Sequence, residues 1–149
     1  MNVLDIKTGV VSYDDFYLNY QEQSKLAEEN PDNQFLQGRG VAGTHDMALG
    51  AKTIDDLCFG LDDIYIPRYN KSAYEGKGDR AEEGSWIKGP LDLVIVEGWM
   101  LGFQPIEKPT PEMEKVNELL SQYVKWEDRI DAAIIISAAD NNYVYQWRE

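Results

Sequence analysis

Two stretches of the chain each end an apolar run on a carboxylate, the group that binds metal ions and accepts protons. In SYDDFYLNY, residues 12–20, a short apolar strand is expected to end at Asp14 and Asp15. In LVIVEGWMLGF, residues 93–103, four apolar residues run directly into Glu97. Ligands of α/β proteins bind beyond the carboxyl ends of parallel strands, which is where these acids would lie. The two stretches therefore predict a site at one edge of a parallel sheet.

The three carboxylates have different expected roles. Successive strand residues point to opposite sides, so one of Asp14 and Asp15 is expected to face the site, and the pattern leaves open which. A carboxylate there can accept the proton of a substrate hydroxyl or hold a metal-bound water. Glu97, followed by the small Gly98, suits a phosphate-bound Mg²⁺, because this ion keeps several waters and needs few protein carboxylates. The alternatives are a helix cap for the Asp pair and an exposed strand end for Glu97.

Cationic side chains gather in two glycine-rich segments, GRGVAGTHD and PRYNKSAYEGKGDR. In a chain with a formal charge of −13, such clusters indicate a small anionic substrate, and arginine is suited to binding a carboxylate. The alternative is solvated loops with local ion pairs, together with a histidine that only forms a hydrogen bond near a helix start. The side chains concerned are Arg39, His45, Arg68, Lys71, Lys77 and Arg80.

Composition limits the class of protein. A chain of 149 residues with 43% hydrophobic residues is long enough for one globular domain. The net negative charge argues against nucleic-acid and anionic-membrane binding, which require a surplus of Lys and Arg. A single cysteine excludes an internal disulfide and suits a reducing compartment. We therefore expect a cytoplasmic protein; an organelle stays open, because an N-terminal targeting segment could have been lost.

The predicted elements alternate between strands and helices, which indicates an α/β fold with a mainly parallel sheet. The strands at 91–96 and 132–137 are near-continuous apolar runs, the pattern of strands buried on both faces. Thr44 is expected to cap a helix that Gly60 ends. Residues 67–90 show little periodicity and are expected to form a long loop. The remaining expected elements are strands at 9–13 and 61–66 and helices at 18–30, at 110–126 and after Asp140.

Five blocks occur in order along the chain: SYDDFYL, GRGVAGTHDM, IPRYNKSAYEGKGDR, LDLVIVEGWMLGF and YVYQWRE. From about Val10 to the last residue they resemble D-glycerate 3-kinase and its fungal and plant relatives. These are P-loop kinases grouped with phosphoribulokinase, uridine kinase and pantothenate kinase. The resemblance implies a three-layer α/β/α fold, ATP and Mg²⁺ as cofactors, and phosphorylation of a small hydroxy acid, D-glycerate, to 3-phosphoglycerate. It also implies one partial domain over residues 1–149, with the acceptor-binding region at about 33–90 and a Walker-B-like strand at 91–98.

The resemblance assigns a role to individual residues. Asp14 falls where the family has a general base or Mg²⁺ contact, and Glu97 matches the Walker-B-like carboxylate that binds Mg²⁺. The family usually has Y-D-K-S where this chain has Asn70 in place of the aspartate, which removes a carboxylate near the acceptor. Four residues, Arg39, His45, Lys71 and Arg80, fall in the acceptor-binding loops, and Arg148 begins the basic lid that reaches the ATP phosphates.

The phosphate-binding loop of the family is missing from this sequence. No G-x-x-x-x-G-K-[ST] motif occurs, and 13 residues precede Asp14, too few for the strand, loop and helix that carry it. In the family that strand lies between the strands expected at 91–96 and 132–137, so these two either pair directly or leave a gap for a missing segment or another chain. We expect the chain alone to be inactive. Two alternatives are a non-catalytic kinase-like protein that binds a small anion or a partner, and an unrelated acidic α/β domain.

Overall fold

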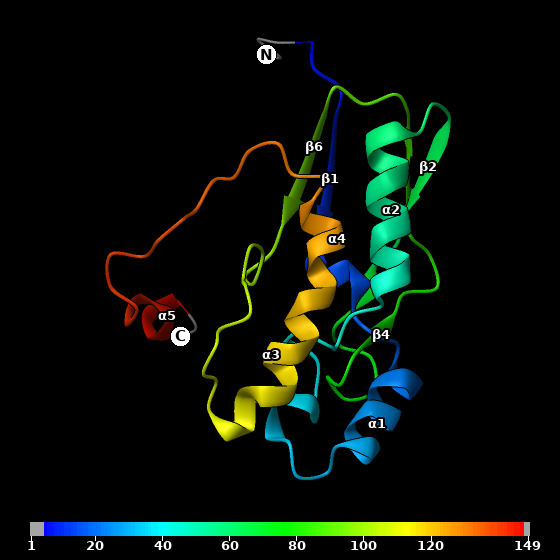
Figure 1. The fold of residues 1–149 in the computed structure, drawn as a ribbon. Helices are drawn as coiled ribbons and strands as arrows, with labels where there is room; N and C mark the ends of the chain where they lie inside the picture. The colour runs from blue at the N-terminus through cyan, green and yellow to red at the C-terminus, as the bar shows by residue number, and fades with distance from the viewer. Residues whose placement is uncertain (1–4, 148–149) are drawn as a thin grey trace.

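The centre of the fold is a pair of parallel strands, β1 (Thr8–Ser12) and β6 (Leu93–Glu97) (Figure 1). This computed structural model describes residues 5–147. The register runs from Thr8 opposite Leu93 to Ser12 opposite Glu97, so both strands end at the same edge. The α/β class with a parallel sheet is confirmed. The parallel sheet has two strands, and the other four described strands form two antiparallel pairs.

One face of the β1–β6 pair packs on the core. Val11 is fully buried, and a Cβ on Gly9 would lie 2.7 Å from Leu91 and 3.2 Å from Leu57 of helix α2 (Met47–Phe59). The chain then turns through the short helix η1 (Tyr13–Phe16). The Ser12 side chain caps this helix by accepting the Asp14 N–H. This turn places two acidic residues directly beyond the end of β1.

A broken helical segment covers η1. It consists of η3 (Pro111–Met113), α3 (Glu114–Leu120), η4 (Ser121–Tyr123) and α4 (Val124–Glu127), where the sequence predicts one continuous helix. Its last turns bring Tyr123 and Trp126 into the core, each with 1% of its surface exposed. The Trp126 ring lies 4.9 Å from that of Tyr13 and 5.2 Å from that of Phe16. The two aromatic residues of η1 are thereby fixed from behind.

Helix α2 begins two residues later than expected, and its cap is Asp46 instead of Thr44. The Asp46 carboxylate accepts a hydrogen bond from the Leu49 N–H at 2.9 Å. Residues 44–46 run antiparallel to residues 16–18, with Leu18 N–H bonded to the Thr44 carbonyl and Asp46 N–H to that of Phe16. The helix therefore cannot start until this pairing ends. Helix α1 (Tyr20–Glu29) begins with a capping box between Asn19 and Glu22, close to its expected start.

The expectation of a long loop at 67–90 is wrong, because three short strands lie within it. β5 (Ser85–Lys88) pairs with β2 (Asp63–Ile66), and β3 (Tyr69–Asn70) pairs with β4 (Asp79–Arg80), both antiparallel. Strands of two to four residues are too short to show an alternating pattern in the sequence. Their pairing depends instead on residues that are distant along the chain.

The strand expected at 132–137 is not formed, and the 91–96 run is buried on one face only. Residues 132–137 are irregular, and Ile134, Ile135 and Ile136 are 91–93% exposed. On β6, Leu93 and Ile95 are 45% and 43% exposed. A strand requires a partner for its backbone groups, and the segment after α4 runs away from β6 (Figure 1). The two segments do not pair directly.

The chain continues to a short helix, α5 (Tyr143–Trp147), where the sequence predicts one after Asp140. Among residues 5–147, no helix is both long and apolar enough to span a membrane.

Candidate active site

A cavity of about 610 Å³ lies beyond the carboxyl end of β1, between η1, helix α1 and the loop after β3. Its lining includes one acid, Asp14, and three cations, Arg39, Lys71 and Lys77. The other lining residues are Tyr17, Tyr20, Gln23, Ser24, Ala27, Gln37, Gly38 and Gly76. A pocket with this surplus of positive charge favours an anionic ligand, although the chain as a whole is strongly acidic.

Asp14 is the acid that faces the cavity. Its carboxylate lies 2.5 Å from the Lys71 ammonium, with 28% of the Asp14 side chain and 59% of the Lys71 side chain exposed. Burial raises the pKa of Asp14, but hydrogen bonding to Lys71 and Tyr17 and the Lys71 charge outweigh it, and the pKa falls below its usual range. The carboxylate is thus ionised and bound to a cation that solvent and ligands can reach.

Asp15 turns away from the cavity into a structural ion pair. One of its oxygens lies 2.7 Å from the Arg68 guanidinium, and the other accepts the Tyr69 N–H at 3.3 Å. The Asp15 side chain is 12% exposed. Arg68 also donates to the Ser85 hydroxyl at 3.2 Å, so the pair joins η1 to the strands of the 63–88 region. Asp14, and not Asp15, is therefore the aspartate that lines the cavity.

Glu97 ends β6 and is exposed, with its Cα opposite that of Ser12. Within residues 5–147 it has no ion-pair partner, and no group of three or more His, Cys, Asp or Glu side chains is arranged to hold a metal ion. Core packing requires a glycine at position 98, because a Cβ there would lie 2.9 Å from that of Tyr13. Asp14 therefore lies just beyond the end of β1, while Glu97 is the last residue of the neighbouring strand β6 and does not line the cavity.

Arg39 binds the backbone of the loop after β3, which lines the cavity with it. Its guanidinium donates to the carbonyls of Gly76 at 2.7 Å, Lys77 at 2.5 Å and Lys71 at 3.3 Å. It also lies over the Tyr69 ring, 5.7 Å from the centroid. Arg39 lines the cavity, and most of its donors bind the backbone.

Lys71 and Lys77 extend from a tightly turned loop. The Asn70 side-chain oxygen accepts the Ser72 N–H at 3.1 Å and the Ser72 hydroxyl at 2.8 Å, an Asx turn that an aspartate would form equally well. The departure from the family's aspartate at this position therefore leaves the turn intact. Lys77 lies over the Tyr20 ring, with its ammonium 5.7 Å from the centroid.

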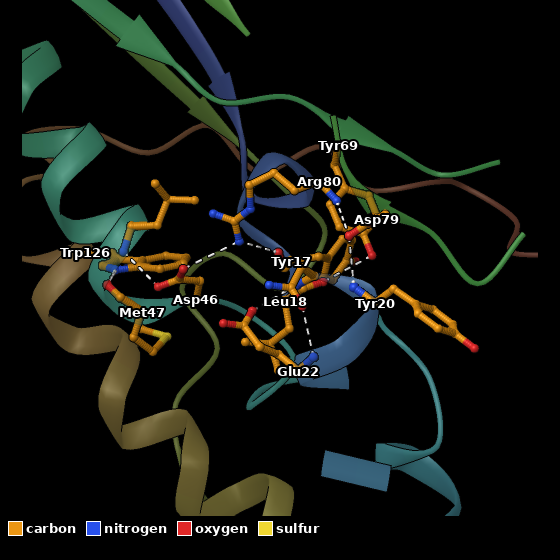
Figure 2. A network of polar contacts seen from close by, with 12 residues as sticks. Tyr17, Leu18, Tyr20, Glu22, Asp46, Met47, Tyr69, Asp79, Arg80 and Trp126 are labelled. Carbon is orange, nitrogen blue, oxygen red and sulfur yellow. Dashed lines mark hydrogen bonds and ion pairs between the residues drawn. The ribbon is translucent and has the colours of Figure 1, made fainter. Parts of the chain in front are cut away.

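His45 and Arg80, two further predicted substrate-binding residues, are not among the residues that line the cavity. Arg80 donates to the Tyr17 carbonyl at 3.0 Å and lies 3.5 Å from the Asp46 carboxylate (Figure 2). The His45 ring stacks on Tyr17 at 4.5 Å, and its Nδ1 lies 2.7 Å from the Tyr123 hydroxyl. Both residues contact the back of Tyr17, which lines the cavity.

Burial makes His45 a neutral group at physiological pH. It is 4% exposed, and burial lowers its pKa to about 4, against the opposing effect of the Asp14 charge. The Tyr123 hydroxyl accepts the Gly43 N–H at 3.1 Å, which leaves its own proton for Nδ1 of the imidazole. His45 therefore does not supply a positive charge to the site.

This pKa leads to a prediction about acid stability. The unfolded imidazole takes up a proton near pH 6.5, but the folded one only near pH 4, so the unfolded state binds more protons between these values. The His45 contribution to stability, about 3 kcal/mol, is full above pH 6.5 and is lost as the pH falls to 4. Urea unfolding at successive pH values measures it. His45 is the only histidine, and His45→Gln removes this loss; identical pH profiles would refute the assignment.

The sequence interpretation missed two aromatic residues of the cavity, Tyr17 and Tyr20. Tyr17 is 4% exposed, and Tyr20 stacks face to face on Tyr74 at 3.9 Å. The sequence shows that aromatic residues follow Asp14 and Asp15, but the rings that contact them come from distant segments of the chain. Arg148, the predicted nucleotide-binding residue, lies outside the described residues.

Acids at the carboxyl edge of two parallel strands, with a cationic cavity beyond β1, lie where α/β proteins bind their ligands. The chain is 43% identical over 154 residues to a chloroplastic D-glycerate 3-kinase of Arabidopsis thaliana, covering 95% of this chain and 34% of that protein. It is 40% identical over 156 residues to a probable ATP-dependent kinase of Saccharomyces cerevisiae, covering 94% of this chain and 54% of that protein. The chain is homologous to part of these kinases.

A solved structure shows the same relation. D-glycerate 3-kinase from Cryptococcus neoformans superposes with a TM-score of 0.89 and 34% sequence identity, covering 96% of this chain and 57% of that one. The predicted resemblance is confirmed, and no protein-family model matches the chain. The chain spans about a third to just over half of the length of these relatives.

Proposed function

We propose that the chain forms the acceptor-binding part of an ATP-dependent kinase for a small hydroxy acid, with D-glycerate as acceptor and 3-phosphoglycerate as product. The observation that carries the proposal is the position of Asp14, at the end of β1 in a cavity with three cationic side chains. A hydroxy acid has both groups that such a cavity can use: a carboxylate for the cations and a hydroxyl for Asp14. The names of the related kinases support the choice of D-glycerate.

In this proposal Asp14 is the general base. Phosphoryl transfer requires mainly positioning and neutralisation of charge. Lys71 and Lys77 hold the acceptor carboxylate. Asp14 takes the proton of the substrate hydroxyl while the hydroxyl oxygen forms a bond to the γ-phosphorus of ATP and ADP leaves. Arg39 holds the loop that carries both lysines. His45 and Arg80 act from behind, by fixing Tyr17.

The proposal extends to the metal and the nucleotide. Glu97 fits a Mg²⁺ site, because its exposed carboxylate lies at the end of β6 and this ion is satisfied by one or two carboxylates and water. Asp14 is the second candidate ligand, although Lys71 occupies one of its oxygens. Bound Mg²⁺ would neutralise charge on the ATP phosphates. We further propose that Arg148 acts on ATP and that the chain is a single partial domain with its acceptor region at 33–90. The proposed location is the cytoplasm or an organelle.

We predict that the 149-residue chain binds D-glycerate but does not phosphorylate it. The lysines supply an anion site, whereas the sequence contains no G-x-x-x-x-G-K-[ST] loop to hold the β- and γ-phosphates of ATP. Calorimetry with D-glycerate should show binding that Lys77→Glu abolishes. Lys115→Glu is the matched control, because Lys115 lies on α3 and pairs with Glu118.

Turnover is measured as ATP-dependent formation of phosphoglycerate, with Glu97→Gln as the background. Turnover by the unaltered chain above that background would contradict the predicted inactivity. Absence of D-glycerate binding, or equal loss of binding in Lys77→Glu and Lys115→Glu, would contradict the acceptor assignment.

A further inference from the structure

The ion pair between Lys71 and Asp14 raises a question about the proposed base. A general base must be free to accept a proton in contact with the substrate hydroxyl. In this structure the Asp14 carboxylate already contacts the Lys71 ammonium at 2.5 Å, so that oxygen is not free to accept the hydroxyl proton. The pair is accessible, because 59% of the Lys71 side chain is exposed, so it is not a buried structural contact.

Lys71 is the cation best able to leave Asp14. Its backbone is fixed, since its carbonyl accepts from Arg39 and the Asx turn at Asn70 precedes it. Its ammonium lies at the end of a flexible four-carbon chain and can turn within the cavity. The pair it would break is partly exposed to solvent, and such ion pairs contribute little to stability. Exchange of partners is therefore energetically inexpensive.

The other charged and titratable groups near Asp14 cannot take the place of Lys71. Arg39 lines the same cavity but is bonded to three backbone carbonyls, and Lys77 lies over the Tyr20 ring. His45 is neutral above its pKa of about 4. Tyr17, on the same turn as Asp14, carries no charge, because burial raises the pKa of its hydroxyl. Lys71 is thus the cation that pairs with Asp14 in the absence of a ligand.

We infer that Lys71 exchanges Asp14 for the carboxylate of the acceptor, so that an acceptor with a carboxylate, unlike a neutral polyol, frees Asp14 to take the hydroxyl proton. This inference rests on the proposed function. It makes Lys71 a specificity-determining residue: the group that recognises the acid is the same group that blocks the base. A neutral triol would leave Lys71 on Asp14 and the base blocked.

A double-mutant cycle measured by calorimetry at pH 7 tests the exchange. If D-glycerate must compete with Asp14 for Lys71, Asp14→Asn removes the competitor and tightens D-glycerate binding by roughly twofold to fivefold, the range expected for one partly exposed ion pair. In a Lys71→Gln background the same substitution gives a much smaller gain, because there is no ammonium to release. In a Lys115→Gln background the gain persists, because Lys115 pairs with Glu118 and does not line the cavity. Glycerol, the neutral probe, shows no tightening with Asp14→Asn.

The outcomes separate the inference from the proposed function. If D-glycerate binds the unaltered chain but Asp14→Asn fails to tighten binding, the exchange is wrong and the acceptor assignment stands. An equal gain in the Lys71→Gln background also overturns the exchange, because simple repulsion between two carboxylates would then account for it. If neither the unaltered chain nor Asp14→Asn binds D-glycerate, both are overturned.

Discussion

Replacement of Trp126 by alanine is expected to lower the free energy of unfolding by about 3 to 5 kcal/mol, the usual cost of truncating a buried tryptophan. Trp126 is 1% exposed and contacts the rings of Tyr13, Phe16 and Tyr123. Its indole N–H also donates to the Met47 carbonyl at 3.1 Å. The substitution leaves a large cavity and removes the indole hydrogen bond to that carbonyl.

The position of Trp126 connects this loss to the site. Tyr13 and Phe16 flank the two aspartates of η1, so the indole ring supports the turn that directs Asp14 into the cavity. Helix α2 makes room for the ring at Gly50, where a Cβ would lie 2.0 Å from it. We expect the variant to lose D-glycerate binding together with stability.

Urea unfolding followed by circular dichroism measures the change. Trp86→Ala is the matched control, because the same side chain is 68% exposed on β5 and its removal should cost about 1 kcal/mol or less. Equal losses in the two variants would show that Trp126 does not support the core as described.

Replacement of Arg68 by methionine is expected to cost about 2 to 3 kcal/mol, because it leaves the Asp15 carboxylate buried without its cation. Asp15 is 12% exposed in its side chain, and its remaining partner is the Tyr69 N–H at 3.3 Å. Arg68 lies three residues before Lys71, so loss of the pair also loosens the loop that faces Asp14. We expect weaker D-glycerate binding as well.

Two further variants make this prediction sharp. Arg129→Met removes an ion pair of the same 2.7 Å length to Asp55, but both of its side chains are nearly half exposed, at 42% and 48%, so the expected loss of stability is much smaller than that of Arg68→Met. The double variant Asp15→Asn with Arg68→Met should recover part of the loss, because no charge is left unpaired. A loss in Arg68→Met no larger than that in Arg129→Met would contradict a structural role for the pair.

The contrast between residues 93–97 and 132–137 shows where sequence patterns fail. Both are apolar runs rich in β-branched residues, and both predict a buried strand. Only the first pairs, because β1 supplies its hydrogen-bonding partner, whereas the three isoleucines at 134–136 remain exposed. Apolar composition favours a strand, but a neighbouring backbone decides whether it forms.

The helix start at residue 47 and the short strands at 69–88 differ from expectation for the same reason. Thr44 has a good capping side chain, yet it is fully buried, and its hydroxyl accepts the Gly40 N–H and donates to the Val41 carbonyl. Residues 44–46 instead pair with residues 16–18. The interaction that displaces the cap comes from a segment nearly 30 residues earlier in the chain. Local propensity is a weak preference that such tertiary pairing overrides.

The sequence by itself determined that carboxylates follow two apolar strands and that cations gather in glycine-rich loops, because both are properties of neighbouring residues. The tertiary structure decided which of them meet. Lys71 comes from 57 residues away to pair with Asp14, and Arg68 from 53 residues away to pair with Asp15. These pairings depend on how η1 and the loop after β3 pack together. For this reason two adjacent aspartates that look equivalent in the sequence differ, one facing the cavity and the other fixing the fold.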